Sequence, residues 1–546
     1  MLFTFNCFLN NIISSFFFLR ALVLWGFVMS SVAALEDDWQ AKFYYAEPPR
    51  MILSSTDGDG PIVELPSFLE LHSATRHYRE MADGIIKQLS MSHEVALRTE
   101  EIFLYHNRSS TQSLSYHLEK KISKTAELLE HNAFVLEEIL KPFPVNAIES
   151  STSNLVCTLG EESIFGLSPS AAESSTDVQH SLARYIPSFG SKKANSDNVN
   201  EEQPYEEAVQ IIAHLTRDWS KDGANLRDEF GWIKEQLWRY HYEMIPNNTE
   251  SVLSPILVPG AGIGRLAFDL AFAQDEECSS DCFVYPFAVE AMDNSIVMAA
   301  AAHHLFHIHK SGNVTNDSMA NNQGQTKIYP FVSDSLTNEV DTQWRWDSTE
   351  IPEQSVLEQL HTMHDQQPHQ RPKLSYTVGD FVTTYSSPSK RGQYGSLVSL
   401  FFIDTATNIY EYILTIRHLL RNGGVWINLG PVQWHRNSQL HPTTNELRDI
   451  IQAVGFEVKH WEVSEKLVAY RHPDDLDSTY SKVRGSRSTR SEAYRPLKFV
   501  AVLKTDESSS DEQEECLLLS IQKVRLLTGR RSIFNMRLDS DEEPDG

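Results

Sequence analysis

The stretch Pro255-Ile-Leu-Val-Pro-Gly260-Ala-Gly262-Ile-Gly264-Arg265 runs from a short apolar segment into three closely spaced glycines, and the apolar residues of RLAFDLAFA follow it. This order predicts a buried strand, a tight turn and a helix. Glycines let the backbone adopt unusual φ and ψ values and approach a ligand closely, and the next helix presents N–H groups without intrahelical partners. We therefore expect a ligand to bind at this turn.

The spacing of the glycines distinguishes two classes of ligand. A dinucleotide-binding turn has the pattern Gly-x-Gly-x-x-Gly, whereas here the third glycine comes one residue early and Arg265 occupies the expected position. The spacing favours S-adenosyl-L-methionine over NAD, and so disfavours an NAD-dependent oxidoreductase. A glycine turn that only tightens the strand–helix junction is the alternative interpretation.

Six further apolar runs follow, and helical patterns separate most of them. Continuous apolar strands that alternate with helices are typical of a largely parallel sheet covered on both faces. The last two runs have no helix between them and are expected to pair antiparallel at one edge. The runs are 283–292, 374–378, 397–403, 424–430, 455–463 and 497–503.

The segments before the glycine turn have other patterns. Apolar residues recur at helical spacing from about 65 to 140, which predicts an N-terminal helical annex over 60–145. Residues 166–204 are rich in Ser, Asn and Lys and are expected to be a linker. The main domain is expected at 205–504. It contains a polar insertion at 310–372, which we expect to be either functional or disordered because it is too long for an ordinary loop.

Charge and cysteine content exclude several classes of protein. The 546 residues include 47 Lys and Arg against 74 Asp and Glu, and a net charge of -27 argues against a nucleic-acid partner. Five scattered cysteines cannot form a closed disulfide framework. Because Cys278 and Cys282 have no second pair, we expect no metal site. The acidic tail at 505–546 is expected to be solvated, with a partner-docking helix at CLLLSIQKVRLL as the alternative.

Residues 1–35 carry no charge apart from Arg20, are rich in aromatic side chains and end in small ones. They resemble a signal peptide or a single membrane anchor, although a basic n-region is missing. An extension that precedes a start at Met29 or Met51 is equally compatible. We therefore expect membrane contact only if this segment is an anchor, and secretory targeting stays open. The sequence does not determine the oligomeric state.

Acidic residues follow several of the predicted strands. Asp293 could accept hydrogen bonds from both ribose hydroxyls of a cofactor, with Glu290 as the competing candidate and helix capping as the alternative role. Asp380 and Phe381 suit the amino group and the ring of an adenine, if they do not simply form a turn. Asp404 should lie at the carboxyl edge of the sheet, where such folds bind ligands, unless it caps the next helix.

Three blocks of this sequence are similar to the carnosine N-methyltransferase family. They are HLTRDWSKDGANLRDE (214–229), ILVPGAGIGRLA (256–267) and FFIDTATNIYEYILTIRHLLRNGGVWINLGPVQWH (401–435). The resemblance covers roughly 205–503. It implies an α/β fold, a Rossmann-like seven-stranded class I methyltransferase sheet with an N-terminal helical annex, and S-adenosyl-L-methionine as cofactor. It also implies methylation of the imidazole of carnosine (beta-alanyl-L-histidine) to anserine, or of related histidyl dipeptides, and a cytoplasmic location with a nuclear one also open.

The family resemblance also implies a role for each matching residue. His214, Asp293 and Ser396 stand where the family has glutamine, glutamate and a small cysteine, so these three depart from its pattern. The implied cofactor-binding residues are His214, Arg217, Gly260, Gly262, Gly264, Asp293, Asp380, Phe381 and Ser396, and the implied substrate-binding residues are Asp404, His435 and Tyr494.

The resemblance makes His435 and Asp404 the catalytic pair. The acceptor imidazole must be neutral to attack a methyl group, and His435 would take the proton that the ring loses as it becomes cationic. Asp404 would fix the amino end of the dipeptide. The alternative from another class is a non-catalytic binding protein on a methyltransferase fold, because His214 and Asp293 depart from the family pattern.

Overall fold

A computed structural model describes most of the predicted main domain and helical annex. The expected N-terminal segment, the linker at 166–204 and nearly all of the acidic tail lie outside the described residues. These comprise 41–45, 52–54, 62–64, 68–103, 113–143, 146–147, 205–242, 255–273, 287–308, 325–334, 339–364, 371–469, 489, 493–504, 521 and 524.

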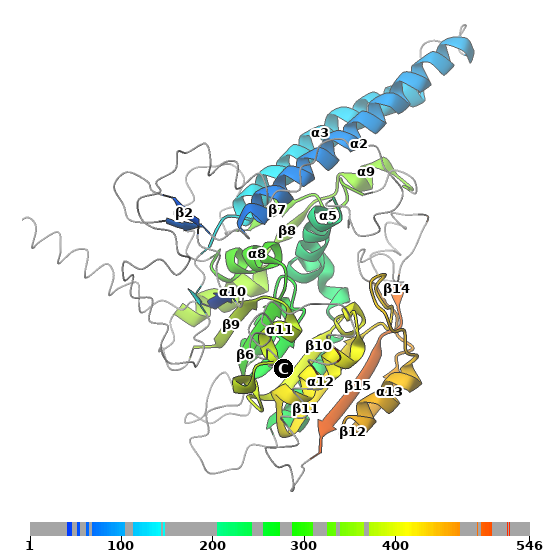
Figure 1. Cartoon of the computed structure of the whole chain (residues 1–546). Helices are drawn as coiled ribbons and strands as arrows, with labels where there is room; N and C mark the ends of the chain where they lie inside the picture. Colours follow the sequence, from blue (N-terminus) through cyan, green and yellow to red (C-terminus); the bar gives the residue numbers. More distant parts are fainter. Residues whose placement is uncertain are drawn as a thin grey trace, which may run out of the picture.

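The centre of the molecule is a nine-stranded sheet in the order β12-β15-β11-β10-β5-β6-β9-β1-β4 (Figure 1). The seven predicted strands are all present and adjacent. Among the described pairings of this sheet, only those of β15 with β11 and with β12 are antiparallel, which confirms the expected antiparallel edge and the Rossmann-like methyltransferase fold. The seven are β5 (Ile256–Pro259), β6 (Ala288–Asp293), β9 (Lys373–Val378), β10 (Tyr394–Leu400), β11 (Leu420–Gly430), β12 (Phe456–Val463) and β15 (Leu497–Leu503).

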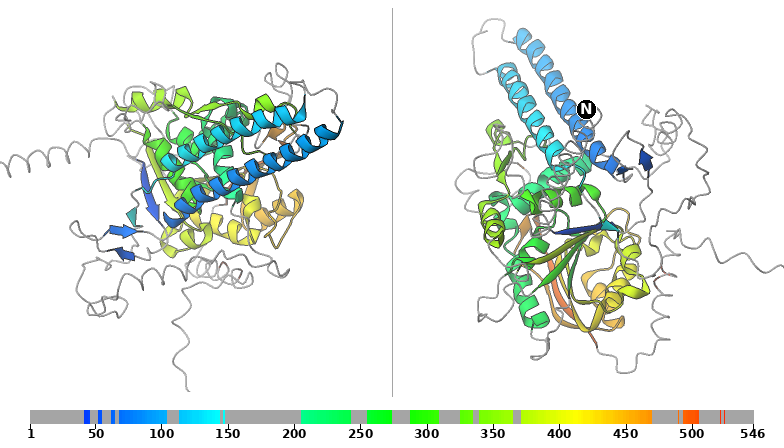
Figure 2. Two further views of the ribbon diagram at one scale, coloured as in Figure 1. Left: turned by 90° about the horizontal axis from the view of Figure 1, so that it is seen from above. Right: turned by 90° about the vertical axis from the view of Figure 1, so that its left-hand side faces the viewer.

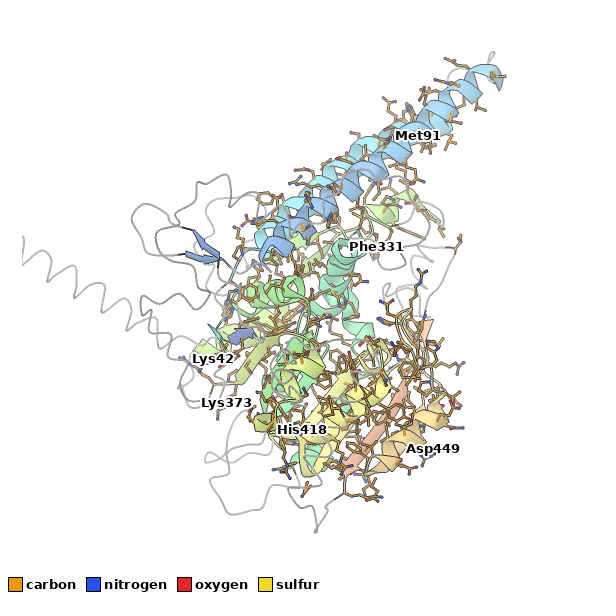
Figure 3. All side chains as sticks on the ribbon, viewed as in Figure 1. Lys42, Met91, Phe331, Lys373, His418 and Asp449 are labelled. Atoms are coloured by element: carbon orange, nitrogen blue, oxygen red, sulfur yellow. The ribbon has the colours of Figure 1, made fainter. Side chains whose placement is uncertain are left out.

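Two further strands extend this sheet, so the expected number of seven is too small. β1 (Lys42–Tyr45) pairs in parallel with β9, and β4 (Asn146–Ala147) pairs with β1. The buried ring of Phe43 stacks on Tyr376, with centroids 5.3 Å apart. Figure 3 shows Lys42 and Lys373 near each other at the amino ends of these neighbouring strands. The N-terminal part of the chain therefore supplies sheet edge as well as helices.

Helices cover both faces of the sheet (Figure 2). Alternate residues of each strand point to opposite faces: Ile256 and Val258 belong to one core cluster, and Leu257 to the other. The first face packs against α5 (Tyr205–His214), α6 (Phe230–Leu237), α7 (Arg265–Ala271), α8 (Ile296–Phe306) and α10 (Gln354–His364). The second packs against α11 (Phe381–Tyr385), α12 (Ile409–Leu419) and α13 (Thr444–Ala453).

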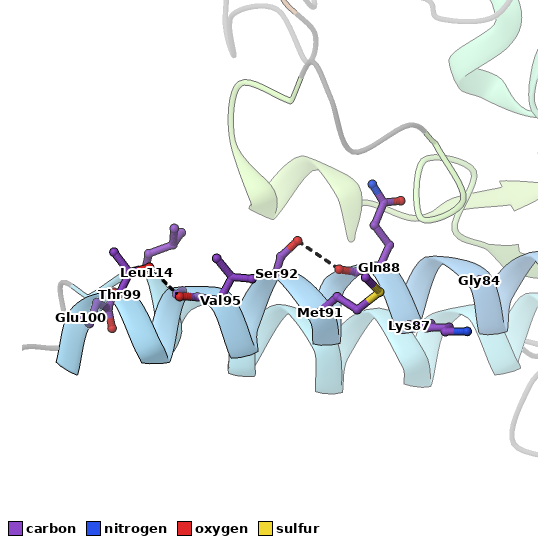
Figure 4. A pocket seen from close by; sticks show the side chains of 10 residues that line it. Gly84, Lys87, Gln88, Met91, Ser92, Val95, Thr99, Glu100 and Leu114 are labelled. Atoms are coloured by element: carbon purple, nitrogen blue, oxygen red, sulfur yellow. Dashed lines mark hydrogen bonds between the residues drawn. The ribbon is translucent and has the colours of Figure 1, made fainter. Parts of the chain in front are cut away.

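The expected helical annex is a long antiparallel hairpin of α2 (Phe68–Phe103) and α3 (Leu114–Ile139), which projects beyond the sheet (Figures 1 and 2). Its inner half belongs to the first core cluster. Its outer half carries an apolar groove in which Met91, Val95 and Leu114 are at least 60% exposed (Figure 4). No helix in the described part of the chain has the length and apolar character needed to cross a bilayer.

The described part of the insertion at 310–372 is ordered structure. It contains the antiparallel strands β7 (Thr326–Ile328) and β8 (Thr349–Ile351), α9 (Thr342–Arg345) and α10. Asn132 of α3 binds both the N–H and the carbonyl oxygen of Tyr329, each at 2.9 Å. Lys121 of the same helix forms an ion pair with Glu339. The insertion therefore joins the hairpin to the main domain.

Three small features complete the fold. β2 (Ile52–Ser54) pairs with β3 (Ile62–Glu64), and β13 (Val468–Ala469) pairs with β14 (Ala493–Tyr494), both antiparallel. Ile521, from the apolar island of the tail, is buried in the second core cluster. At this position the tail is therefore packed and not solvated.

Candidate active site

The carboxyl ends of five adjacent parallel strands meet at one edge of the sheet and carry most of the predicted site residues. The chain runs outward from β5 through β6 to β9, and then returns to the other side of β5 with β10 and β11. Such a reversal of strand order opens a crevice where α/β sheets bind ligands. The residues at these strand ends are Gly260, Asp293, Asp380, Asp404 and His435.

The glycine turn has left-handed backbone conformations at all three glycines, with φ of 64°, 54° and 78° at Gly260, Gly262 and Gly264. A Cβ atom at Gly260 would lie 2.4 Å from Cδ2 of Phe402, and one at Gly264 would lie 2.7 Å from Cζ of Phe306. The predicted strand, turn and helix are confirmed. The turn needs glycine both for its conformation and for close packing.

Asp293 ends β6 and binds the glycine turn directly. Its Oδ2 accepts the N–H of Gly262 at 2.9 Å, and its Oδ1 accepts the N–H of Ser295 at 3.0 Å. Burial raises the pKa of this carboxyl, and the N–H groups that it accepts oppose the rise. The cap of α8 is Ser295 and not Asp293. Asp293 therefore lies beside the turn, where the predicted cofactor contact requires it.

Glu290, the competing acid, faces a different environment. Its Oε1 accepts hydrogen bonds from the hydroxyls of Thr377 and Tyr385, at 2.8 and 2.6 Å, and its Oε2 accepts one from Tyr394 at 2.7 Å. Burial, followed by the charge of Glu290, holds the pKa values of both tyrosines above their ordinary range. The Glu290 carboxylate thus connects β6 with β9, β10 and α11, whereas Asp293 is the acid of β6 that contacts the glycine turn.

His214 and Arg217 lie together against the glycine turn. Arg217 donates to both oxygens of Asp218, at 2.6 and 2.8 Å, and its Nη2 lies 2.7 Å from Nδ1 of His214. A guanidinium can only donate, so Nδ1 accepts this bond. Burial and the Arg217 charge lower the pKa of His214, and Asp218, whose Oδ2 lies 3.3 Å from Nδ1, opposes this change. A Cβ atom at Gly262 would lie 3.6 Å from this ring.

Asp218 is a site residue that the sequence interpretation missed. Burial alone would raise the pKa of its carboxyl, but the charge of Arg217 and the hydrogen bonds that it accepts hold the pKa well below its ordinary range. Asp218 lines a pocket at the carboxyl edge, together with other ionisable side chains. The acid next to Arg217 in TRDWS was the available signal. The ionisable lining comprises His214, Arg217, Asp218, Arg227, Glu229 and Arg265.

Asp380 and Phe381 lie at the next strand end, at the start of α11. Asp380 caps this helix, and its Oδ1 accepts the N–H and the hydroxyl of Thr383 at 2.9 and 2.7 Å. The Phe381 ring is buried, with its edge against Phe402 and Tyr412 at centroid distances of 5.3 and 5.2 Å. Both residues therefore have a structural role at the start of α11, Asp380 as its cap and Phe381 in the core, in addition to their position at the strand end.

Ser396 is the one predicted cofactor residue that the structure places away from this edge. It is in register with Ile256, the first residue of β5, and with Val425 in the middle of β11, and its Oγ lies 2.8 Å from Nδ1 of His241. Four residues of strand, about 13 Å, separate it from the end of β10. The residues of β10 and its end that line the pocket are Leu400 and Phe401.

Asp404 and His435 are brought together from the ends of β10 and β11. The N–H of His435 donates to the carbonyl oxygen of Asp404 at 3.0 Å, and Oδ2 of Asp404 accepts the N–H of Gln433 at 3.1 Å. Burial raises the pKa of Asp404, opposed by the Gln433 N–H and by His435. The His435 ring is exposed, and Asn408, not Asp404, caps α12.

Tyr494 reaches the same region from β14, where it pairs with Val468. Its ring meets Phe401 edge to face at a centroid distance of 6.4 Å. Phe401 has a φ of 51°, a conformation that a phenylalanine rarely adopts, and it lines the pocket. Strained residues of this kind cluster at ligand sites. Sequence reasoning did not identify Phe401 because conformation is not visible in residue type.

Tyr376 supports the glycine turn from below. Its buried hydroxyl donates to the carbonyl oxygen of Gly262 at 2.6 Å, and burial raises the pKa of the phenol well above its ordinary range. Among the described residues no group of three or more His, Cys, Asp or Glu could hold a metal ion. Cys278 and Cys282 lie outside the described part of the chain.

Known proteins resemble this chain over the part that builds the site. The model of a family described as Carnosine N-methyltransferase matches residues 194–505. Carnosine N-methyltransferase of Schizosaccharomyces pombe is 30% identical over 266 residues, covering 46% of this chain and 62% of that protein. The Mus musculus protein of the same name is 27% identical, covering 45% and 54%. The Drosophila melanogaster protein Carnosine N-methyltransferase unmet is 26% identical, covering 46% and 48%.

This chain thus spans about half the length of the curated relatives it matches. Solved structures are more distant. A Haemonchus contortus phosphoethanolamine N-methyltransferase 2 in complex with S-adenosyl-L-methionine has 12% sequence identity and a TM-score of 0.28, covering 56% of this chain and 59% of that one. The family model, however, matches more than half of the 546 residues, including every residue of the strand-end cluster, so the chain belongs to the carnosine N-methyltransferase family.

Proposed function

We propose that this chain is an S-adenosyl-L-methionine-dependent N-methyltransferase whose acceptor is the imidazole of carnosine or of a related histidyl dipeptide. Family membership supports the reaction class. The observation that carries the proposal is the pairing of Asp404 with His435 at neighbouring strand ends, on the same sheet edge as the glycine turn. An acid and an exposed imidazole are thus held together beside a turn suited to a small cofactor.

The residues at the edge fit S-adenosyl-L-methionine. Gly260 leaves part of the pocket wall as bare backbone, and Asp293 offers a part-buried carboxylate that accepts the N–H of Gly262. Arg217 and Asp218 present opposite charges, which suits the zwitterionic amino-acid end of this cofactor. When bound, the cofactor supplies an electrophilic methyl group on a sulfonium.

His435 is the proposed proton acceptor. A neutral acceptor imidazole attacks through one nitrogen and would become cationic, so its other N–H must lose a proton. The exposed ring of His435 can accept this proton through either nitrogen. The hydrogen bond from its backbone N–H to Asp404 fixes the position of the main chain from which the side chain extends.

Asp404 is the proposed binding group for the cationic amino end of the dipeptide. Asp404 is only 4% exposed, and its Oδ2 accepts the N–H of Gln433. Charge-assisted hydrogen bonds are strong where the acceptor is buried from solvent, because the local dielectric constant is low. Phe401 and Tyr494 add an aromatic wall on the same side, and aromatic faces attract a ring that becomes cationic.

The test is incubation of the purified chain with methyl-labelled S-adenosyl-L-methionine and carnosine, histidyl peptides or anserine, followed by mass spectrometry. Methyl-labelled anserine, formed from carnosine, is the expected product. Anserine is the matched control, because its acceptor nitrogen is already methylated. A chain that binds the cofactor but labels none of these acceptors would show the substrate to be wrong. One that binds no cofactor would support the non-catalytic alternative.

A further inference from the structure

Glu353 lies between β8 and α10 in the insertion, which the proposed function does not use. Its side chain is 14% exposed. It is not among the residues that line the pocket at the carboxyl edge, yet both of its side-chain partners, Arg227 and Arg265, are. The Glu353 side chain can therefore affect the pocket through these two arginines.

Both oxygens and the backbone of Glu353 are engaged. Oε2 accepts Nη2 of Arg227 at 2.9 Å, Oε1 accepts Nη2 of Arg265 at 2.5 Å, and the N–H donates to the carbonyl oxygen of Trp219 at 2.7 Å. Glu353 is 126 residues away from Arg227 and 88 from Arg265 in the chain. One side chain therefore joins three distant segments.

The two arginines in turn hold the backbone of the segment that carries the predicted cofactor contacts. Nη1 of Arg227 donates to the carbonyl oxygens of Arg217 and Ser220, at 2.5 and 3.0 Å. Nη1 of Arg265 donates to that of Asp218 at 2.8 Å. Arg265 is also the first residue of the helix that follows the glycine turn.

The charges in this network balance. Arg227 and Arg265 are buried, and Glu353 and Asp269 are the carboxylates that neutralise them. Loss of one charge from a buried network leaves its partner charged and uncompensated, which is far more disruptive than loss of a surface pair. The position of both guanidinium groups thus depends on Glu353.

We propose that Glu353 is a positioning residue for the cofactor site, which holds the segment at 215–227 and the helix after the glycine turn in a fixed relation through Arg227 and Arg265. This inference rests on the proposed function. It gives the insertion a role in cofactor affinity without contact between the insertion and the ligand.

The test compares Glu353→Gln with Glu350→Gln, a matched control at an exposed position of the same insertion. In the cofactor-free protein, we expect Glu353→Gln to speed amide hydrogen exchange at 215–227 by about tenfold or more and to leave residues 397–430 unchanged. Calorimetry should show a roughly tenfold weaker affinity for S-adenosyl-L-methionine. We expect kcat at saturating cofactor to stay within about threefold. Glu350→Gln should match the wild-type protein.

Two further variants guard against a simple loss of folding. Glu353→Asp keeps the charge and should recover part of the affinity. Arg227→Lys keeps the charge but loses the forked geometry, and it should weaken cofactor binding in the same direction. If Glu353→Gln changed neither exchange at 215–227 nor affinity, the proposal would be overturned. Faster exchange throughout the sheet would also overturn it, because it would show general destabilisation.

The same data separate this inference from the proposed function. If the wild-type chain bound no S-adenosyl-L-methionine, the proposed function would fail. Faster exchange in Glu353→Gln, confined to residues 215–227, would then still support the positioning role of Glu353. Unchanged exchange in this variant would overturn that role.

Discussion

The backbone N–H of His435 donates to the backbone carbonyl oxygen of Asp404 across 3.0 Å, and this bond joins the loops that follow β10 and β11. It places an exposed imidazole beside a nearly buried carboxylate. Because the bond uses only main-chain atoms, either side chain can be replaced without breaking it.

Substitution of these two side chains should remove turnover and spare cofactor binding. For His435→Gln we expect kcat to fall on the order of 100-fold or more, since acid–base groups commonly contribute that much. For Asp404→Asn we expect kcat/KM for the dipeptide to fall by roughly 10-fold or more, since the variant loses a charge-assisted hydrogen bond to the amino end. Affinity for S-adenosyl-L-methionine should stay within about threefold. Steady-state kinetics and calorimetric titration check this. Loss of cofactor binding in either variant would contradict their assignment to the substrate side.

Two acids on β6 should respond differently to amide substitution. Asp293→Asn removes a carboxylate beside the glycine turn, and we expect cofactor affinity to fall by about tenfold, the loss of one charged hydrogen bond. Glu290→Gln should leave affinity unchanged and lower the free energy of unfolding by about 1–3 kcal/mol, because one buried hydroxyl loses its acceptor. Titration calorimetry and urea unfolding distinguish them. The reverse pattern would return Glu290 to the ribose-binding role.

Alanine substitutions at the turn glycines should differ in cost. Gly260→Ala and Gly264→Ala combine left-handed strain, about 1–2 kcal/mol, with overlap against Phe402 and Phe306. Gly262→Ala meets only ordinary contacts at 3.6 Å and should cost about the strain alone. Gly84→Ala is the control: it lies inside α2 with nothing within 4 Å and should add about 0.5–1 kcal/mol of stability. Equal losses at all three turn positions would refute the contribution of packing.

Acid should destabilise the protein through His241. Burial and the charge of Arg421 lower its pKa from 6.5 to about 4, so below pH 6.5 the unfolded chain binds a proton that the folded chain does not. Stability from this residue is complete above pH 6.5 and is lost as the pH falls toward 4, at about 1.4 kcal/mol per pH unit. Urea unfolding at several pH values should show roughly 3 kcal/mol less acid sensitivity in His241→Gln than in the wild-type protein. Parallel curves for the two proteins would contradict the pKa assignment.

The sequence predicts the seven main strands because most of them are short apolar runs. It predicts the glycine turn because glycine tolerates backbone conformations that other residues rarely adopt. It does not predict β1 and β4, which have four and two residues, because so short a strand has no measurable period. Ser396 is a cofactor residue only by resemblance to the family, and a match of residue positions does not show where along its strand a residue lies.

Contacts between distant segments are the other part that sequence reasoning cannot reach. Glu353 lies in a polar insertion with no recognisable motif, and its two arginine partners are 126 and 88 residues away. Nothing local to residue 353 distinguishes it from the exposed Glu350. Likewise, the strained Phe401 is an ordinary residue of an apolar run until the backbone angle is seen.

The helical hairpin shares one apolar core with the sheet, since Tyr78 and Leu136 belong to the same cluster as Val258. Complete burial of one large aliphatic side chain is worth about 1.5–3 kcal/mol. A recombinant fragment that starts at residue 205 would therefore expose the apolar side chains of α5 and α8 that the hairpin covers, and it would tend to precipitate. Anyone who trims this protein for crystallisation should shorten the tip of the hairpin and keep its base.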